Sequence, residues 1–234
     1  MRRLRHPATA ALALLASVAV SAGCSGSSSG SGDPRARLRQ ARAVLDATPA
    51  LHVALTSANL PTSGTTLKAA EGDVARPDKF QGTLTVGLGG GSLEVKVVSA
   101  GGSVYAQLPF ASGLSKIDPK DYGVGDPAKL IDPNGGISGL LVSPLTATAR
   151  SGDRLQGELL EEFAVALDGA QVAAVLTSAD PSRPVSGVIG ISAKSKQLRR
   201  VVLTGPFFDP SVLTTFTLVL TGYGEKLSIT APAG

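Results

Sequence analysis

The pattern of apolar and polar positions separates a short N-terminal segment from the rest of the chain. Residues 8–20 form an apolar run of thirteen residues without a charge, and three arginines precede it. A helix needs about 20 apolar residues to span a bilayer, so this run is too short. We interpret residues 1–23 as a secretory signal peptide that takes no part in the fold. An uncleaved N-terminal membrane anchor is the alternative.

A helical pattern follows in residues 34–47, PRARLRQARAVLDA. Asp33 suits the N-cap position and Pro34 suits the first helical position. The apolar residues fall on one stripe at helical spacing: Leu38, Ala41, Val44 and Leu45. The segment is predicted to be an amphipathic helix that packs on another layer.

After Pro49 the spacing of apolar residues changes to two, which is typical of strands with one buried face. Glycine turns at 89–91 and 101–102 separate several of these segments, which predicts an antiparallel meander. The expected strands of the first half are 51–55, 66–76, 79–88, 92–98 and 103–109.

Residues 110–144 carry many Pro and Gly residues and are predicted to form a long loop with one or two short helices. A short helix is expected at 169–176. The expected strands of the second half are 146–150, 161–167, 184–193, 197–204, 212–220 and 225–230. The predicted class is α+β: one domain over 34–234, built as a curved antiparallel sheet with helices on its apolar face.

Composition adds two points about the interior and the partners. Aromatic residues make up only 4% of the chain and Trp is absent, so Val, Ile, Leu and Ala must form the core. Removing the three signal arginines leaves 19 basic and 18 acidic residues, a net charge of about +1. This balance does not indicate a nucleic-acid partner.

Cys24 is the only cysteine, so the chain cannot form an internal disulfide. It ends the small-residue run SAGC, which resembles the lipobox of bacterial lipoproteins. The resemblance implies that Cys24 is the mature N-terminus and carries fatty acids such as palmitate, since stable anchoring takes more than one acyl chain. A free thiol is the alternative. Residues 24–33 would then be the lipidated cysteine and a flexible Ser/Gly tether.

Candidate catalytic groups are sparse. His52 is the only histidine after the signal segment, and its strand phase indicates a solvated side chain. The acidic group Glu158, Glu161 and Glu162 is predicted to be solvated surface, and the basic stretch 194–200 is predicted to be a charged turn or a contact for anionic headgroups. Outside the Ser/Gly tether, the sequence has no G-x-S-x-G, Walker or H-E-x-x-H motif. We therefore expect no enzyme activity, no cofactor and no metal.

The segment 113–143, GLSKIDPKDYGVGDPAKLIDPNGGISGLLVS, resembles the central signature of the LppX/LprA/LprF/LprG family of mycobacterial and related actinobacterial lipoproteins. Leu114 occupies the place of the tryptophan usual in that family. The matching positions are Asp118-Pro119, Tyr122-Gly123, Asp126-Pro127, Leu130-Ile131, Asp132-Pro133, Gly136 and Leu140-Leu141.

The resemblance implies a half-barrel of the LolA/LolB type, wrapped around helices, with an apolar cavity for an acylated lipid or glycolipid of the triacylated kind. It also implies carriage of that lipid across the cell envelope, from the outer face of the cell membrane, with a membrane lipid exporter as a possible partner. The residues expected to line the cavity are Val53, Leu55, Leu84, Val86, Val95, Val97, Val104, Ala106, Leu130, Leu140 and Leu141.

Two alternatives remain open from the sequence. Each cavity residue is equally compatible with an ordinary filled core, because a period of two gives the face of a strand and not what covers it. A filled core would favour a scaffold or accessory subunit of an envelope transporter. A hydrolase with an unrecognised serine nucleophile would require His52 or a carboxylate.

Overall fold

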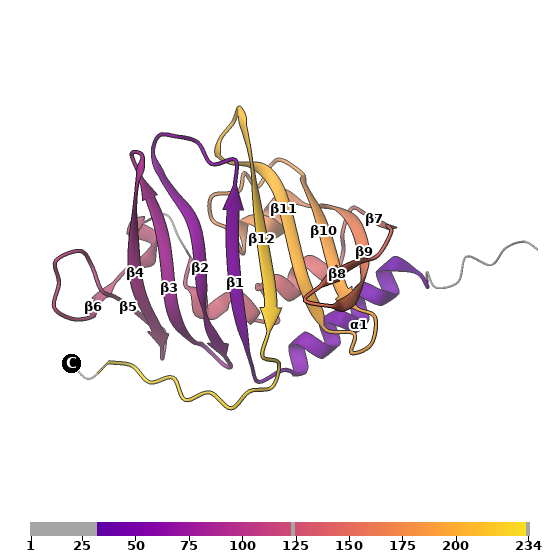
Figure 1. Ribbon diagram of the computed structural model, residues 1–234, viewed down its shortest axis with the longest axis horizontal. Coiled ribbons are helices and arrows are strands. Elements are labelled where there is room, and N and C mark those ends of the chain that lie inside the picture. Colours follow the sequence, from indigo (N-terminus) through magenta and orange to yellow (C-terminus); the bar gives the residue numbers. More distant parts are fainter. Residues whose placement is uncertain (1–31, 123–124, 233–234) are drawn as a thin grey trace, which may run out of the picture. The chain divides into compact units, whose positions relative to one another are not determined.

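The computed structural model describes residues 32–122 and 125–232 (Figure 1). The predictions for the signal peptide, Cys24 and most of the tether lie outside the described residues, as does Gly123 of the central signature. The secondary-structure elements all belong to one compact unit, Ser31–Gly234. In the described part of the chain, no helix has the length and apolar character needed to cross a membrane.

Helix α1, Pro34–Ala47, confirms the predicted helix. Its N-cap is Asp33, whose carboxylate accepts a hydrogen bond from the Arg35 backbone N–H. The stripe residues Leu38, Ala41 and Leu45 are fully buried. The helix therefore forms where the cap, the proline and the apolar stripe all indicated it.

The remaining elements make one antiparallel sheet of 12 strands with short helices. The strands are β1 Ala50–Ala58, β2 Thr65–Ala75, β3 Lys79–Leu88, β4 Gly91–Ala100, β5 Ser103–Ala106, β6 Ser115–Ile117, β7 Thr146–Ala149, β8 Asp153–Leu155, β9 Glu158–Leu167, β10 Val185–Ser192, β11 Leu198–Asp209 and β12 Val212–Thr221. The short helices are η1 Pro119–Tyr122, η2 Pro127–Ile131, η3 Ile137–Leu141 and α2 Gly169–Ala173.

The strand order is β6-β5-β4-β3-β2-β1-β12-β11-β10-β9-β7, with β8 paired to β9. Pairing of β1 with β12 joins the N-terminal and C-terminal halves into a single open sheet. Helices α1, η2 and η3 pack on one side of it, which we call the inner face. The predicted class is confirmed as a curved antiparallel sheet with few helices.

The expected strand at 225–230 is wrong. These residues follow β12 as a non-strand segment along the end of the sheet. Ile229 packs there with Ala50 and Ala75 in a small separate cluster. The alternating residues Leu227 and Ile229 thus serve packing at the end of the sheet, and the segment cannot pair with β12, which already has β1 on one side and β11 on the other.

Candidate functional site

The strand register places the eight predicted cavity residues of β1 and β3–β5 on the inner face. One row across the sheet runs from Val53 through Gly72 and Gly82 to Val97 and Ala106. The next row runs from Leu55 through Ala70 and Leu84 to Val95. Val86 and Val104 take the same face in the flanking rows, opposite Leu93 and Ser99 respectively. These rows give the inner face a continuous apolar surface.

Burial changes along these rows. Val53, Val97, Val104 and Ala106 are buried in the main core. Leu55, Leu84 and Val95 are half-buried and only flank that core, and Val86 is half-buried without packing against it. The inner face is therefore a filled core at one end and an open apolar wall at the other. We call the open end, where the β1–β2, β3–β4 and β11–β12 turns lie, the upper end (Figure 1).

Helices η2 and η3 cover the filled end. Leu140 and Leu141 of η3 are fully buried, and Leu130 of η2 is half-buried against the core. The helix η2 is tied to the sheet by Ser99, whose hydroxyl donates to Asp126 Oδ1 over 2.7 Å. The same carboxylate oxygen accepts from the Ala128 backbone N–H and caps the helix. Asp126-Pro127 of the central signature thus fixes the position of η2 on the sheet.

Two glycines create the room for one aromatic ring in this wall. Gly72 and Gly82 are direct neighbours in β2 and β3, and a Cβ on either would meet the Phe80 ring within 3 Å. A Cβ on Gly82 would also lie 2.2 Å from the Glu71 carbonyl oxygen. The ring of Phe80, buried at 2% exposure, fills the space that the missing side chains leave. This closes the filled end of the inner face.

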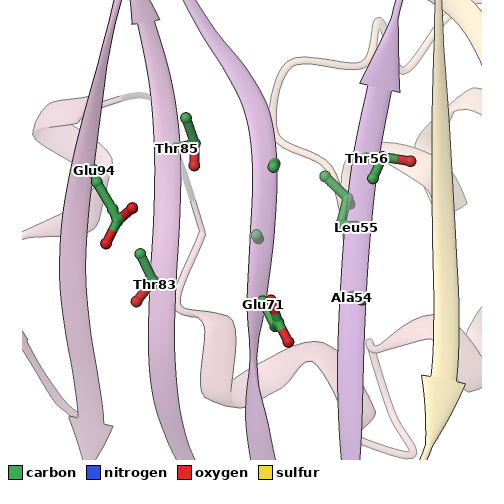
Figure 2. Close-up of a pocket in the computed structure, with 9 residues that line it drawn as sticks. Ala54, Leu55, Thr56, Glu71, Thr83, Thr85 and Glu94 are labelled. Carbon is green, nitrogen blue, oxygen red and sulfur yellow. The ribbon is translucent and has the colours of Figure 1, made fainter.

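The outer face of the sheet is polar and carries a shallow hollow of about 320 Å³ (Figure 2). Its outer-face lining comes from Ala54 and Thr56 of β1, Ala69 and Glu71 of β2, Thr83 and Thr85 of β3 and Glu94 of β4. Hydroxyl and carboxylate groups at its mouth suit water, not acyl chains. The apolar surface of this domain is on the opposite face.

His52 lies on the outer face, as its strand phase predicted, but it is not simply solvated. Its Nδ1 is 2.8 Å from Asp73 Oδ1 and its Nε2 is 3.4 Å from Glu71 Oε1. The side chain keeps 31% exposure. Both ring nitrogens thus face carboxylates of the neighbouring strand β2.

The prediction that Glu158, Glu161 and Glu162 form a solvated cluster is wrong. Glu158 pairs with Arg199, with 2.9 Å between Oε2 and Nε. Glu161 pairs with Arg37 of α1, and Glu162, at 7% exposure, pairs with Arg200. Successive side chains of a strand point to opposite faces, which separates Glu161 from Glu162. Glu158 has the phase of Glu162, but each of the three carboxylates is held by an arginine of its own.

These ion pairs also involve most of the basic side chains in the stretch 194–200. Arg199 and Arg200 bind carboxylates of β9, and Lys196 Nζ lies 3.5 Å from Glu161. Of the four basic residues in this described stretch, Lys194 is the one for which no ion pair is found, and it is exposed. The stretch forms the β10–β11 turn as predicted, and its charges serve the fold more than a headgroup contact.

Sequence reasoning missed two residues of the open wall. Leu67 of β2 lies opposite Val86, and Leu93 of β4 lies opposite Val86 on its other side. Both are half-buried. The alternation of 92–98 already indicated Leu93. Leu67 was hidden because β2 has a register shift between Leu67 and Ala69, which breaks the period of two.

Comparison with known proteins identifies similar chains over most of the length. The profile of the LppX_LprAFG lipoprotein family matches residues 33–229. The curated protein named lipoarabinomannan carrier protein LprG, from Mycobacterium tuberculosis strain H37Rv and from Mycobacterium bovis, is 26% identical over 231 residues, which covers 94% of both chains.

Solved structures agree on the fold. The crystal structure of LprF from Mycobacterium bovis superposes with a TM-score of 0.69 at 17% identity and covers 87% of this chain and 99% of that one. Lipoprotein LppX from Mycobacterium tuberculosis gives a TM-score of 0.63 at 16% identity, with coverage of 85% and 100%. The sheet and helices described above are therefore the architecture of these proteins.

Proposed function

We propose, because the chain belongs to the LppX_LprAFG lipoprotein family, that it binds the acyl chains of a lipid or glycolipid against the inner face of its sheet. Relatives named as lipoarabinomannan carriers support a glycolipid as the ligand class. The observation that carries the proposal is the open apolar wall formed by Leu55, Leu84, Val86 and Val95. Soluble domains rarely leave such a surface without a partner.

The physical reason is the cost of an acyl chain in water. Burial of one methylene is worth about 0.8 kcal/mol, so an exposed sixteen-carbon chain costs on the order of 10 kcal/mol. A half-buried wall of Leu and Val beside a filled core can remove much of that cost. The polar headgroup stays at the upper end, in water.

The open wall is expected to select lipids by the shape of their acyl chains. Leu, Val and Ala side chains offer no directional bonds, so apolar pockets discriminate weakly between chains of the same width. Space at the upper end would decide how many chains enter. A triacylated lipid is the expected ligand, and the proposal assigns no catalytic step to the chain.

We also propose carriage through the envelope with the domain held at the outer face of the cell membrane by acyl groups on Cys24. The match to a lipoprotein family over residues 33–229 supports this anchoring. A tethered domain can take a lipid from a membrane and present it elsewhere, for example to a membrane exporter.

The test is the lipid content of the folded domain. We expect residues 31–234, expressed in an actinobacterial host, to show an added mass in native mass spectrometry that releases acylated lipid on extraction. Val86→Trp should reduce the lipid-bound fraction several-fold, because the indole would occupy the open wall. Val86 does not pack against the core cluster, so this variant is expected to stay folded.

Thr85→Trp is the matched control, since Thr85 is the next residue of β3 and lines the outer hollow. Melting curves of both variants separate unfolding from loss of ligand. A lipid-free wild-type protein that also takes no lipid from vesicles would overturn the proposal and favour an accessory subunit of a transporter. Equal lipid loss in both variants would place the ligand away from the inner face.

A further inference from the structure

Charge is distributed unevenly among the turns of the sheet, and the turns beside the open wall carry none. The upper-end turns 59–64, 89–90 and 210–211 contain no charged residue. The lower-end segments 76–78, 193–197 and 222–226 contain six, namely Arg76, Asp78, Lys194, Lys196, Glu225 and Lys226. Neutral turns are ordinary in water, but the absence of charge in these three turns removes the usual obstacle to contact with a less polar phase.

Large apolar side chains also protrude at the upper end. Leu88, the last residue of β3, is 48% exposed, and Leu213, at the start of β12, is 58% exposed. Leu60 and Pro61 of the β1–β2 turn are half-buried and line a hollow of about 220 Å³ together with Leu88. Together, Leu60, Pro61, Leu88 and Leu213 form what we call the upper rim.

The rim continues into the open wall. Leu84, Val86 and Leu88 alternate along β3 and share the inner face. An acyl chain that enters between the turns would meet apolar side chains from the rim down to the filled core. No charged residue of β3 interrupts this path, because its only charged residue, Lys79, is at the lower end.

We propose that the upper rim is a membrane-contact surface, which inserts its leucines into the headgroup boundary of a bilayer. Exposed Leu side chains gain free energy at that depth, whereas charged side chains lose it. Lys68 fits this position, because its Nζ donates to the Gly91 carbonyl at the β3–β4 turn and can remain at headgroup level. The inference goes beyond lipid binding, since it states where the domain meets its membrane.

The contact is limited to one part of the upper end. The connection from β9 to β10, residues 168–184, starts and ends there too and carries Asp168, Asp180 and Arg183. The Asp180 and Asp209 carboxylates accept hydrogen bonds from Ser182 and Ser211 respectively, which lower their pKa values and keep both charged. The surface therefore comprises the β1–β2, β3–β4 and β11–β12 turns. The charged Asp209 carboxylate, held by Ser211 in the β11–β12 turn, has to remain at headgroup level.

The experiment is flotation of residues 31–234 with neutral phosphatidylcholine vesicles. Leu88→Ser combined with Leu213→Ser should weaken vesicle binding roughly ten-fold or more, because two half-exposed leucines leave the boundary. Leu159→Ser is the matched control. Leu159 has 49% exposure but lies in β9 at the lower end.

A second control is Phe110→Ser, because Phe110 is the most exposed large apolar residue among those described, at 107%, and lies in the loop between β5 and β6. The proposal predicts that both controls bind vesicles like the wild type. Three results would overturn it. The first is an equal loss of vesicle binding in Leu159→Ser or Phe110→Ser. The others are a wild type that does not bind neutral vesicles, and binding that needs anionic lipid and disappears in salt.

The result is separable from the test of lipid binding. A protein that contains lipid but ignores vesicles would overturn the upper rim and leave the proposed function intact. A lipid-free protein whose vesicle binding is lost only when Leu88 and Leu213 are replaced would support the upper rim and overturn the proposed lipid binding.

Discussion

Replacing Arg200 by Ala should destabilise the domain far more than the loss of an ordinary surface cation. Its guanidinium contacts Glu162 and lies 2.6 Å from Asp153 Oδ2, so it joins β8, β9 and β11. Gly190 of β10 stands between Glu162 and Arg200 in the register. A Cβ at Gly190 would lie 3.2 Å from the Arg200 Cβ, so the bare backbone gives the arginine its route across β10.

The magnitude follows from burial. The Glu162 side chain is 8% exposed and that of Arg200 17%. Removal of one partner of a buried pair costs about 3–5 kcal/mol, and the residual exposure here favours the lower figure. A domain of this size loses about 2–4 °C of melting temperature per kcal/mol, which gives a fall of about 6–12 °C.

The assay is urea and thermal unfolding of residues 31–234. Arg39→Ala is the control, because Arg39 is 61% exposed and 3.7 Å from Asp33, a pair worth about 0.5 kcal/mol or less. Arg200→Met with Glu162→Leu should recover much of the loss, since apolar groups can replace a buried pair. A loss for Arg200→Ala no larger than that for Arg39→Ala would refute the argument.

Two further stability predictions follow from the sheet. Gly82→Ala should cost about 2 kcal/mol or more, measured by urea unfolding, because its Cβ would strike the Glu71 carbonyl and the Phe80 ring; an unchanged midpoint would contradict this. Burial raises the pKa of Tyr223, whose hydroxyl donates to the Leu198 carbonyl. The folded state therefore keeps the phenol proton that the unfolded chain loses above about pH 10, and stability should fall as pH rises from there. Tyr223→Phe should remove that alkaline loss, and a wild-type melting temperature that stays flat above pH 10 would speak against it.

Local signals predicted the elements that depend on local physics. Asp33, Pro34 and the apolar stripe specify α1 without help from other segments. The glycine turns at 89–90 and 101–102 have positive φ values and connect β3 to β4 and β4 to β5, as their composition indicated. The period of two likewise identified which residues share the inner face.

The same local signals could not predict which distant segments pair with each other. The acidic residues 158, 161 and 162 looked like one surface group, but their partners come from α1 and β11. The segment 225–230 alternates like a strand, but its Leu227 and Ile229 pack with Ala50 and Ala75 and the segment pairs with no strand. A local pattern states what a segment can do, and its neighbours decide whether it does so.

The candidate site shows the same division. The sequence by itself determined the inner face, the order of apolar residues along each strand and the family signature of 113–143. Only the tertiary structure decided that Val53 and Val97 lie in a filled core while Leu84 and Val86 form an open wall. Alternation along a strand sets the direction of a side chain, whereas its depth depends on η2 and η3, which cross some rows of the sheet and leave others uncovered.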